Sequence, residues 1–598
     1  MRPQFFRALV VLISLAAVSC GGGATISPGP GPSPDFSIQV TPAATGVTQG
    51  GAGSTVNVTI SPLHGFNSNV IVTLLTLPAG VTTNPVSPFP VAAGATLAVT
   101  FTASAAAATG SLPVTFHGSS GTRLHSAGLS LSVNAPPPAN AVRMTLDPAR
   151  QFQTWTAWRA SAGGPQFILN NGATQVVPPV VMSAVLDDAV FDLGITGLRL
   201  NLHANWMIES TNDNNDPNVI NWAAFDFTRP FLVEGGQVDP VLRYQQMVMP
   251  FKQRVESRGE PFHSYVSPIY TRAAWPAHWQ QNPEEYAEVA EAFVTWLRTP
   301  ARNAIGVNLT PDYWVVVNEP DLHNFPDAEI AADVIAVGTR FQARGIPTRV
   351  ATIESAGPDL TMLNSVLSVP GVRNHVSMLT FHGYDYFTPT PAEFARRNGF
   401  RSAAQSFGAQ TGMSEICCKA GWDRGGYDHG LGYARDIYWN MTEADVSVWE
   451  PLALMNPCNA LGCPTGGGPP LVLDADLSRH FKFAHYYALR QYSRYIRPGA
   501  RRLALSCDNC ANDATLGLNV KGVAFRSPAG KTLAVVLNDQ LVAQSVALNG
   551  FPAGAYDITG VDPLNATSPV NYPGVAIGAG QPLTVNLPAQ AILTIVQQ

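Results

Sequence analysis

The feature that most constrains the fold is a series of short apolar segments between residues 153 and 450, with helical spacing in several of the stretches between them. Eight such segments can be counted. Strands that alternate with helices are typical of β/α architecture, and eight of them close a (β/α)8 barrel. The candidate strands centre on Gln153 to Trp158, Gly197 to Leu202, His263 to Ile269, Tyr313 to Asn318, Thr348 to Ile353, Met378 to His382, Gln410 to Ser414, and Val446 to Glu450. Helical spacing is clear at Pro283 to Leu297 and at Arg479 to Ile496.

Two glutamates stand where candidate strands end. Glu319 follows the fourth strand in Trp314-Val-Val-Val-Asn-Glu-Pro320, and Glu415 follows the seventh in Thr411-Gly-Met-Ser-Glu415, 96 residues later. Catalytic side chains of such barrels come from the carboxyl ends of different strands, so these two would face each other across the mouth. Hydrolysis of a glycosidic bond needs one carboxylic acid and one carboxylate. The pair therefore predicts a carbohydrate-cleaving enzyme.

Each of these motifs also has a purely structural interpretation. Asn318-Glu319-Pro320 suits the start of any helix after a strand, and its weight comes from the second carboxylate on strand seven. Arg199 is a charge inside the apolar strand Gly197-Leu-Arg-Leu-Asn-Leu202, where it would be costly without a partner. We expect Glu415 to be that partner; an ordinary structural salt bridge is the alternative.

The first 20 residues predict an export signal. Arg2 and Arg7 precede an apolar run from Ala8 to Val18 that is too short to span a bilayer. Ala17-Val-Ser-Cys20 resembles a bacterial lipobox, in which the cysteine is acylated. We expect an exported bacterial lipoprotein, anchored to the membrane through Cys20 at the periplasmic face or the cell surface. A plain signal peptide is the alternative.

Composition shifts divide the rest of the chain into further regions. Residues 21–35 are a Gly/Pro linker, and residues 36–134 alternate in the manner of an immunoglobulin-like β-sandwich. We interpret that sandwich as a spacer, with sugar binding as the alternative. A Pro linker at 135–140 precedes the barrel at 141–497, and residues 498–598 predict a C-terminal β-sandwich. The segment Ala141 to Leu146 is a candidate strand of that last sandwich.

The overall composition suits a loop-rich, β-rich secreted protein. Charged residues make up 13% of the chain, the formal net charge is -6, and 52 Gly and 49 Pro accompany 46% hydrophobic residues. There is no basic patch with interleaved aromatic residues, and the mild negative charge would repel a phosphate backbone. We therefore expect no nucleic acid partner.

The cysteine count favours disulfides over metal binding. Seven cysteines less the proposed lipid anchor leave six, an even number in an exported chain. Cys507 with Cys510 and Cys458 with Cys463 are candidate local pairs. A zinc site would need four ligands at suitable spacing, so we expect neither a metal nor a cofactor.

The motifs together resemble a known family. Besides Asn-Glu-Pro and the strand-seven glutamate, Phe152-Gln-Thr154 is similar to that family's first barrel strand, and Tyr492-Ser-Arg-Tyr-Ile-Arg-Pro-Gly499 is similar to its run into a side sandwich. From about Ala141 to Gln598 the chain resembles the clan A retaining glycoside hydrolases, and most closely family 30, whose members include glucosylceramidases, xylanases and β-1,6-glucanases. It departs at Trp155 to Arg159, where the family usually has Gly-Phe-Gly.

The resemblance implies a role for each site residue. Glu319 would be the acid and then the base, while Glu415 would attack the anomeric carbon, so that the configuration of the sugar is retained. The implied substrate-binding residues are Asn318, Arg199, His382, Tyr384, Trp449 and Trp155. Asn318 would bond the sugar 2-hydroxyl, and the Tyr384 hydroxyl would touch the nucleophile. His382 has the alternative of a core histidine, and Trp449 and Trp155 have that of core tryptophans.

Three hypotheses follow for function. The first is a retaining β-glycosidase that acts on a β-linked polysaccharide or oligosaccharide, as an anchored monomer without a cofactor. The second is a catalytically inactive glycan-binding lipoprotein, and the third is an adhesion or scaffold protein. The third leaves the two strand-end glutamates unexplained. The sequence does not distinguish endo from exo action, and it does not name the sugar.

Overall fold

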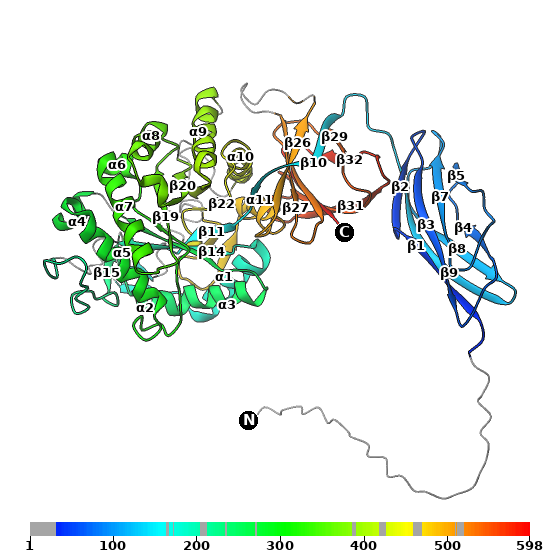
Figure 1. The fold of residues 1–598 in the computed structure, drawn as a ribbon. Coiled ribbons are helices and arrows are strands. Elements are labelled where there is room, and N and C mark those ends of the chain that lie inside the picture. Colours follow the sequence, from blue (N-terminus) through cyan, green and yellow to red (C-terminus); the bar gives the residue numbers. More distant parts are fainter. Residues whose placement is uncertain are drawn as a thin grey trace, which may run out of the picture.

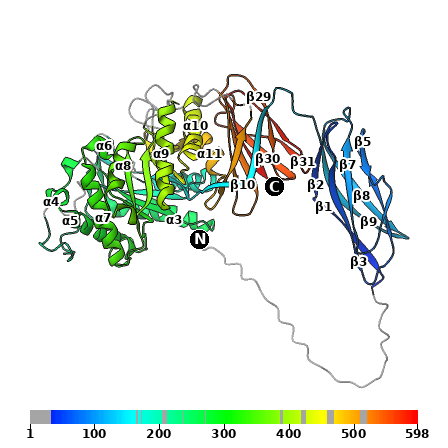
Figure 2. The same ribbon diagram turned by 45° about the horizontal axis from the view of Figure 1, so that its top comes forward.

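The computed structural model describes residues 32–598 except 163–166, 171–172, 204–211, 234–235, 270–271, 385–389, 418–425, 458–468, 509 and 511–518. The proposed signal and Cys20, most of the first linker, and the pair Cys458 and Cys463 lie outside the described residues. Three units stand in a row (Figures 1 and 2): a barrel, a second unit in the middle, and an N-terminal unit at the far end. The middle unit is built largely from the chain's C-terminal residues, so the order in space differs from the order in sequence.

The predicted (β/α)8 barrel is confirmed. Its eight strands are parallel and close in the order β11-β14-β17-β18-β19-β20-β21-β22. Their bounds are β11 (Ala157–Ser161), β14 (Gly197–His203), β17 (His263–Ile269), β18 (Tyr313–Val315), β19 (Arg349–Ser355), β20 (Val376–His382), β21 (Gln410–Glu415) and β22 (Val448–Trp449). The strands are apolar nearly throughout because helices cover the outer side of the barrel while side chains fill its interior.

The first barrel strand begins later than the sequence pattern predicts. Gln153 and Thr154 belong to β10 (Val142–Thr154), which pairs with β26 (Arg501–Cys507) outside the barrel. That pairing has register shifts between Asp147 and Thr154, and the chain enters the barrel only at Ala157. One continuous apolar segment thus serves two sheets, which a strand pattern alone does not separate.

Helices surround the barrel in Figure 1. They are α1 (Pro179–Asp187), η1 (Asp188–Leu193), α2 (Pro240–Arg243), η2 (Tyr244–Val248), α3 (Met249–Ser257), η3 (Arg272–Ala274), α4 (Ala277–Gln281), α5 (Pro283–Arg298), α6 (Pro320–His323), α7 (Asp327–Ala343), α8 (Leu360–Ser368), η4 (Val372–Asn374), α9 (Pro391–Phe407), α10 (Tyr427–Glu443) and α11 (Ala484–Ser493). The predicted helix from Pro283 is α5, whose first turn is capped by the Asn282 side chain, 3.1 Å from the Glu284 amide. The other predicted helix is shorter than expected, since His480–Lys482 form β25.

The middle unit, here called the side domain, is one nine-stranded sheet around its own apolar core. Its strands run in the order β31-β30-β33-β28-β27-β26-β10-β29-β32. They are β27 (Val520–Arg526), β28 (Thr532–Asn538), β29 (Gln544–Asn549), β30 (Gly554–Val561), β31 (Val570–Ile577), β32 (Leu583–Leu587) and β33 (Ile592–Gln597), with β10 and β26. The expected place of Ala141 to Leu146 is confirmed, because β10 pairs with both β26 and β29.

The predicted pair Cys507 and Cys510 is disulfide-bonded at the end of β26. Three small sheets complete the strands: β12 (Phe167–Asn170) with β13 (Ala173–Val176), β15 (Phe231–Val233) with β16 (Gly236–Val238), and β23 (Met455–Pro457) with β24 (Leu471–Leu473) and β25. Among the described residues no helix is both long and apolar enough to span a membrane.

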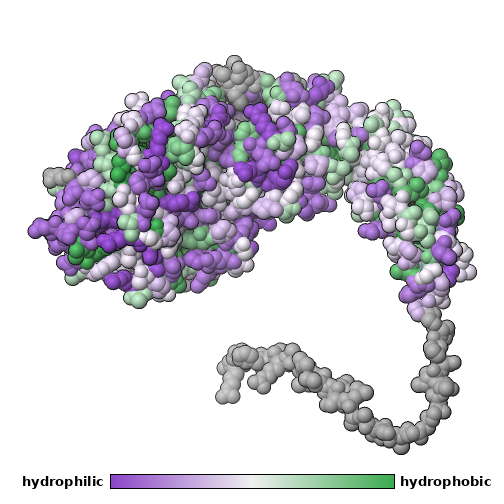
Figure 3. All heavy atoms as spheres, viewed as in Figure 1, coloured by the Kyte–Doolittle hydropathy of each residue, from purple (hydrophilic) through white to green (hydrophobic). Residues whose placement is uncertain are grey.

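The N-terminal unit consists of two sheets that share a separate apolar core. One contains β1 (Asp35–Thr41), β3 (Ser54–Leu63), β7 (Thr96–Ala103) and β5 (Val81–Asn84); the other contains β2 (Ala44–Thr48), β9 (Arg123–Asn134), β8 (Gly110–Ser120), β4 (Val70–Leu75) and β6 (Phe89–Val91). The alternating pattern thus forms two layers of strands, while the immunoglobulin-like assignment stays a prediction. Asp35 and Arg123 are its only side chains with a permanent charge, and Figure 3 draws much of this unit in pale and green tones.

The N-terminal unit rests on the side domain through neutral polar contacts. The Asn134 side chain donates to the Ala576 carbonyl at 2.9 Å, and the Gln581 side chain donates to the Ala52 carbonyl at 2.8 Å. Gly46 allows this close approach, since a Cβ there would lie 2.0 Å from the Ala576 oxygen. A substitution of Gly46 would therefore have to separate the two units.

The side domain and barrel share an aromatic core that offers a test of the fold. Trp158 is fully buried, and its indole nitrogen donates to the Ile496 carbonyl at 2.7 Å. Its ring centroid is 4.3 Å from that of Trp155. We expect Trp158→Ala to destabilise the barrel by about 3–5 kcal/mol, because it removes a large core side chain.

Urea unfolding followed by tryptophan fluorescence measures this change, since all 11 tryptophans lie between residues 155 and 449 and report on the barrel. Leu564→Ala is the control, because Leu564 is 94% exposed and should shift stability by no more than about 0.5 kcal/mol. Equal midpoints for the two variants would contradict the assigned core.

Candidate active site

Glu319 is the fourth residue after the end of β18, at the carboxyl end of the barrel. It has a left-handed backbone (φ 45°), and α6 begins at the next residue, Pro320. Its amide donates to the carbonyl of Glu354 at 3.0 Å, and Glu354 is also left-handed (φ 56°). This conformation costs a non-glycine residue about 1–3 kcal/mol and is concentrated at functional sites. The two strand ends are thus held by each other in an unfavourable conformation.

Glu415 is the last residue of β21, on the opposite side of the mouth. One of its carboxylate oxygens accepts from the Tyr384 hydroxyl at 2.7 Å, and the other accepts from the Arg199 guanidinium. Its own carbonyl accepts from the Gly383 amide at 2.8 Å. The expected contacts of Arg199 and Tyr384 with Glu415 are therefore confirmed, and together they fix the direction of the carboxylate.

Glu319 and Glu415 are close enough to act on one bond. Carboxylate oxygens of both residues and a ring nitrogen of His382 lie within 4.8 Å of one another. The Glu319 side chain is 16% exposed, and Glu415 is 7% exposed. Carboxyl groups at about 5–5.5 Å are characteristic of retaining glycosidases, whereas inverting enzymes need about 6.5–9.5 Å to admit a water molecule.

Three ligand-type side chains at this spacing also resemble a metal site. However, the guanidinium of Arg199 already occupies one side of Glu415 as a cation. A divalent ion bound there would face that positive charge at short range. The donor set fits an ion-paired acid and base better than it fits a metal.

Arg199 in β14 is the cation at the centre of the site, and it is fully buried. In addition to Glu415 it bonds the side-chain oxygen of Asn318. Its third and fourth partners are the Ser267 hydroxyl at 3.0 Å and the Glu354 carboxylate at 3.2 Å. Burial would lower the pKa of Arg199, but the charges of Glu354 and its other anionic neighbours hold that pKa well above the usual value. The guanidinium is thus permanently charged.

His382, the last residue of β20, lies among three carboxylates. Its Nδ1 is 3.0 Å from Glu319 and 3.8 Å from Glu415, and its Nε2 is 3.7 Å from Glu354. Burial would lower the pKa of His382, yet the three carboxylates raise it to about 10. Burial would likewise raise the pKa of Glu319, but the hydrogen bond from His382 and the positive charge of the His382 ring lower that pKa.

Glu354 is a third carboxylate that the sequence analysis missed. It is fully buried in β19, and burial would raise its pKa, but Arg199 and then His382 lower that pKa to about 2. The signal was present, because Glu354 directly follows the predicted strand Thr348 to Ile353, as Glu319 and Glu415 follow theirs. Glu450, after β22, obeys the same rule and is fully buried. Burial raises the pKa of Glu450 to about 8 against the opposing charge of Arg159.

Four of the residues predicted to bind substrate are fully buried: Arg199, His382, Trp449 and Trp155. Arg199 and His382 contact the two glutamates at the mouth. Trp449 and Trp155 are fully buried and have no surface that a sugar could reach. The Trp449 indole donates to the Asp436 carboxylate at 2.6 Å and packs edge-on to Tyr433. Both tryptophans belong to the main apolar core, where a barrel of this size needs large apolar side chains. The alternative assignment as core residues holds for both.

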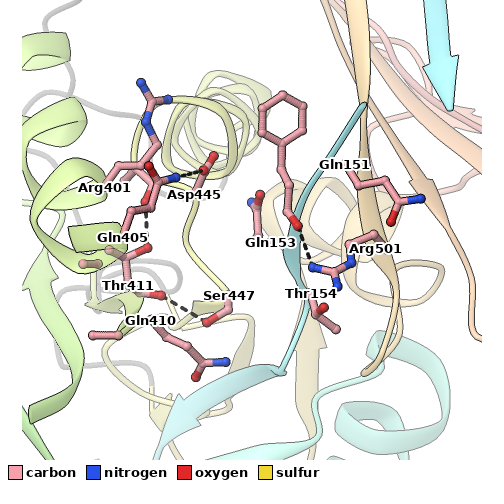
Figure 4. Close-up of a pocket in the computed structure, with 14 residues that line it drawn as sticks. Gln151, Gln153, Thr154, Arg401, Gln405, Gln410, Thr411, Asp445, Ser447 and Arg501 are labelled. Carbon is pink, nitrogen blue, oxygen red and sulfur yellow. Dashed lines mark hydrogen bonds between the residues drawn. The ribbon is translucent and has the colours of Figure 1, made fainter. Parts of the chain in front are cut away.

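A cavity of about 430 Å³ lies away from these glutamates, at the opposite end of the barrel (Figure 4). It is lined by Gln151, Phe152, Gln153, Thr154, Arg401, Ala404, Gln405, Ala409, Gln410, Thr411, Ala444, Asp445, Ser447 and Arg501. Gln410 begins β21, whereas Glu415 ends it, so the cavity is at the amino end of the strands. Its polar groups bond one another, as Gln405 does with Asp445 at 3.2 Å. It has no part in the chemistry of the mouth.

Solved structures with a similar fold include members of glycoside hydrolase family 30. The catalytic domain of a family 30 xylanase from Talaromyces cellulolyticus superposes with a TM-score of 0.56 at 16% identity, over 76% of this chain and 100% of that one. A family 30 endoxylanase from Clostridium papyrosolvens gives 0.51 at 17% identity, over 76% and 100%. An endo-β-1,6-glucanase gives 0.52 at 14% identity, over 77% and 95%.

A curated relative points the same way. The lysosomal acid glucosylceramidase of Mus musculus is 25% identical over 184 residues, which are 29% of this chain and 33% of that protein. The match thus spans about a third of the length of that relative. No protein-family model matches the chain. The resemblance that the motifs indicate is therefore confirmed: the chain is similar to family 30 of clan A in fold, and in part in sequence.

The buried charges predict how stability depends on Arg199 and on pH. Glu354 has a folded pKa near 2, below its ordinary 4.5. Its ionised form therefore contributes stability above pH 4.5, and that contribution is lost as the pH falls towards 2. We expect Arg199→Met to cost about 3–5 kcal/mol at pH 7, because it leaves buried carboxylates without a cation. The cost should shrink towards pH 4, as those carboxylates take up protons.

Urea unfolding at several pH values measures both effects. Arg479→Met is the control, since Arg479 is 68% exposed in its pair with Asp474 and should contribute less than about 1 kcal/mol. A cost for Arg199→Met that does not change with pH would contradict the charge argument.

Proposed function

We propose that the protein is a retaining β-glycosidase that hydrolyses a β-linked polysaccharide or oligosaccharide by double displacement. The observation that carries the proposal is the approach of Glu319 and Glu415 to within 4.8 Å at the mouth of a barrel with the fold of family 30. The family 30 xylanases, the glucanase and the glucosylceramidase with which it compares act, by their names, on β-linked glycans or glucosylceramide.

In the first step the Glu415 carboxylate attacks the anomeric carbon while Glu319 gives a proton to the leaving oxygen. Arg199 and the Tyr384 hydroxyl hold the attacking carboxylate in place. In the second step Glu319 takes a proton from water, whose oxygen bonds to the anomeric carbon and releases Glu415. Two inversions leave the configuration of the sugar unchanged.

Asn318 is placed to position the substrate. It is 4% exposed, and Arg199 donates to its side-chain oxygen, so its amide group is free to turn its N–H bonds towards the mouth. An N–H donor at this point suits a sugar 2-hydroxyl, a contact that strengthens in the oxocarbenium-like transition state. The alternative of an inactive glycan-binding protein does not account for a complete acid, nucleophile and counter-charge.

We expect Glu319→Gln and Glu415→Gln to separate the two roles. Loss of a general acid lowers the rate by about 10²–10⁴-fold, but less for an aryl glycoside whose leaving group needs no proton. Loss of the nucleophile should abolish product from both kinds of substrate.

The measurement is product release from a panel of β-glucans, xylans and galactans, with aryl β-glycosides beside them, using protein that lacks residues 1–34. Proton NMR of the first product would give its anomeric configuration. Wild-type protein that binds a glycan without releasing product would favour the glycan-binding alternative, and an inverted product would overturn the double displacement.

We further infer that the protein is exported and anchored through an acylated Cys20, with residues 36–134 as an immunoglobulin-like spacer. The support is the signal-like order of residues 1–20 and the lipobox-like segment that ends at Cys20. The enzyme would act as a monomer at the periplasmic face or the cell surface. This arrangement would hold the barrel away from the membrane.

We expect Cys20→Ala to move the protein from the membrane fraction to the soluble fraction, because a lipid chain is the proposed anchor. Fractionation of cells that express each form, followed by immunoblotting, measures the shift. A Ser19→Ala form keeps the cysteine and should remain with membranes. Membrane retention of Cys20→Ala would contradict the lipid anchor.

A further inference from the structure

The proposed acid raises a question about its proton. Glu319 has to be protonated when it meets the leaving oxygen, yet its hydrogen bond with His382 favours the ionised carboxylate. The residue that favours the charged form is itself a proton donor, 3.0 Å away. The proton that catalysis requires is therefore available next to Glu319, on the imidazole ring.

The surroundings of His382 favour a proton on both ring nitrogens, because each nitrogen faces a carboxylate. Nδ1 faces Glu319 at 3.0 Å, and Nε2 faces Glu354 at 3.7 Å. A neutral imidazole has one nitrogen without hydrogen, and that lone pair would point at a carboxylate. The ring is fully buried, so no bulk water stands between the partners. The doubly protonated form matches both sides.

Glu354 is held rigidly on the far side of the ring. Arg199 and the Ser267 hydroxyl donate to one of its oxygens, and the Tyr265 hydroxyl lies 3.3 Å from the other. It is fully buried beneath the mouth, so it does not touch a substrate. Its negative charge acts on the site through the groups that it contacts.

Other charged and titratable groups lie around His382 or contact its carboxylate partners. They are Glu319 and Glu415 at two strand ends, Arg199 behind the carboxylates, Asp321 and His323 on α6, Glu450 and Tyr265 deeper in the barrel, and Tyr384, whose ring centroid is 5.8 Å away. Of the carboxylates, only Glu354 faces Nε2 at close range. It is the one charge whose removal affects that nitrogen without altering the proposed acid or nucleophile.

We propose that Glu354 is a positioning residue that keeps His382 doubly protonated, so that His382 and Glu319 together hold the one proton that the leaving group requires. The inference rests on the proposed glycosidase function. During the first step Nδ1 of His382 gives its proton to Glu319, which passes a proton to the glycosidic oxygen as the bond to carbon breaks. In the second step the proton that Glu319 takes from water restores the charge on His382. No proton is gained or lost over the cycle.

A structural role for Glu354 would have different consequences. If Glu354 served only to orient Arg199, its loss would lower the rate equally at every pH. If it supports the charge on His382, its loss weakens proton binding by the pair of His382 and Glu319. The alkaline limb of kcat/KM, which reports loss of that proton, would then move to lower pH.

The test compares Glu354→Gln with wild-type protein by two readouts. The first is a titration of the His382 ring by nitrogen-15 NMR of histidine-labelled protein, with His382→Gln to assign the signal. We expect a pKa near 10 in the wild type and a fall of at least about one unit in Glu354→Gln. The second is the pH profile of kcat/KM, whose alkaline limb should fall by a similar amount.

Three further variants sharpen the result. Ser267→Ala removes a contact of both Glu354 and Arg199 without changing charge, and its alkaline limb should stay within about 0.3 units of the wild type. Glu354→Asp keeps the negative charge, so its alkaline limb of kcat/KM should lie close to that of the wild type. In a His382→Gln background, Glu354→Gln should cause no further shift. If Glu354→Gln does not fold, the His382→Gln variant still tests the proposal. An alkaline limb of kcat/KM in His382→Gln that matches the wild type would overturn it.

The two proposals can fail separately. An active enzyme whose His382 titration and alkaline limb are unchanged in Glu354→Gln refutes the role of Glu354 and leaves the glycosidase in place. A wild-type protein that forms no product refutes the glycosidase and with it the proton transfer, even where the NMR titration shifts as expected.

Discussion

The buried guanidinium of Arg199 is the interaction on which the rest of the site depends. A charge in the middle of an apolar strand is tolerated only if anionic and polar groups surround it. Glu415 and Glu354 meet that need from two other strands, and Asn318 meets it from the segment after β18. The same contacts fix the directions of these side chains, so the requirement to satisfy one cation also organises the barrel mouth.

The side domain contributes to this organisation from outside the barrel. Its strand β10 leads directly into β11, and Tyr427 at the start of α10 donates to the carbonyls of Val561 and Gln590. Lys521 of β27 and Arg435 of α10 both pair with the buried Asp539. Helix α10 follows β21, the strand that ends at Glu415. The position of that glutamate is thus tied to a domain that has no part in the chemistry.

Much of this arrangement could be predicted from the sequence because it follows from period and position. The eight apolar segments predicted the barrel, and position at the ends of predicted strands identified Glu319 and Glu415 as candidate site residues. Which tryptophans are buried was harder to predict. The sequence around Trp449 and Trp155 is the same whether the ring fills the core or lies open to a sugar. The start of β11 was missed because Gln153 and Ala157 lie in one apolar run that two sheets divide. Glu354 obeys the strand-end rule but was not predicted, because two carboxylates already account for glycoside hydrolysis and the sequence pattern does not call for a third.

The third carboxylate changes the electrostatic character of the mouth. Counted at formal charges, the three carboxylates of Glu319, Glu354 and Glu415 with the two cations Arg199 and His382 sum to about -1. Under the proposed mechanism the reacting sugar develops positive charge at its anomeric carbon. Fixed charges that sum to a negative value stabilise that transition state more than the neutral substrate, and they are in place before the reaction begins. Two carboxylates with two cations would give no such field, so Glu354 supplies the excess negative charge although it never touches the sugar.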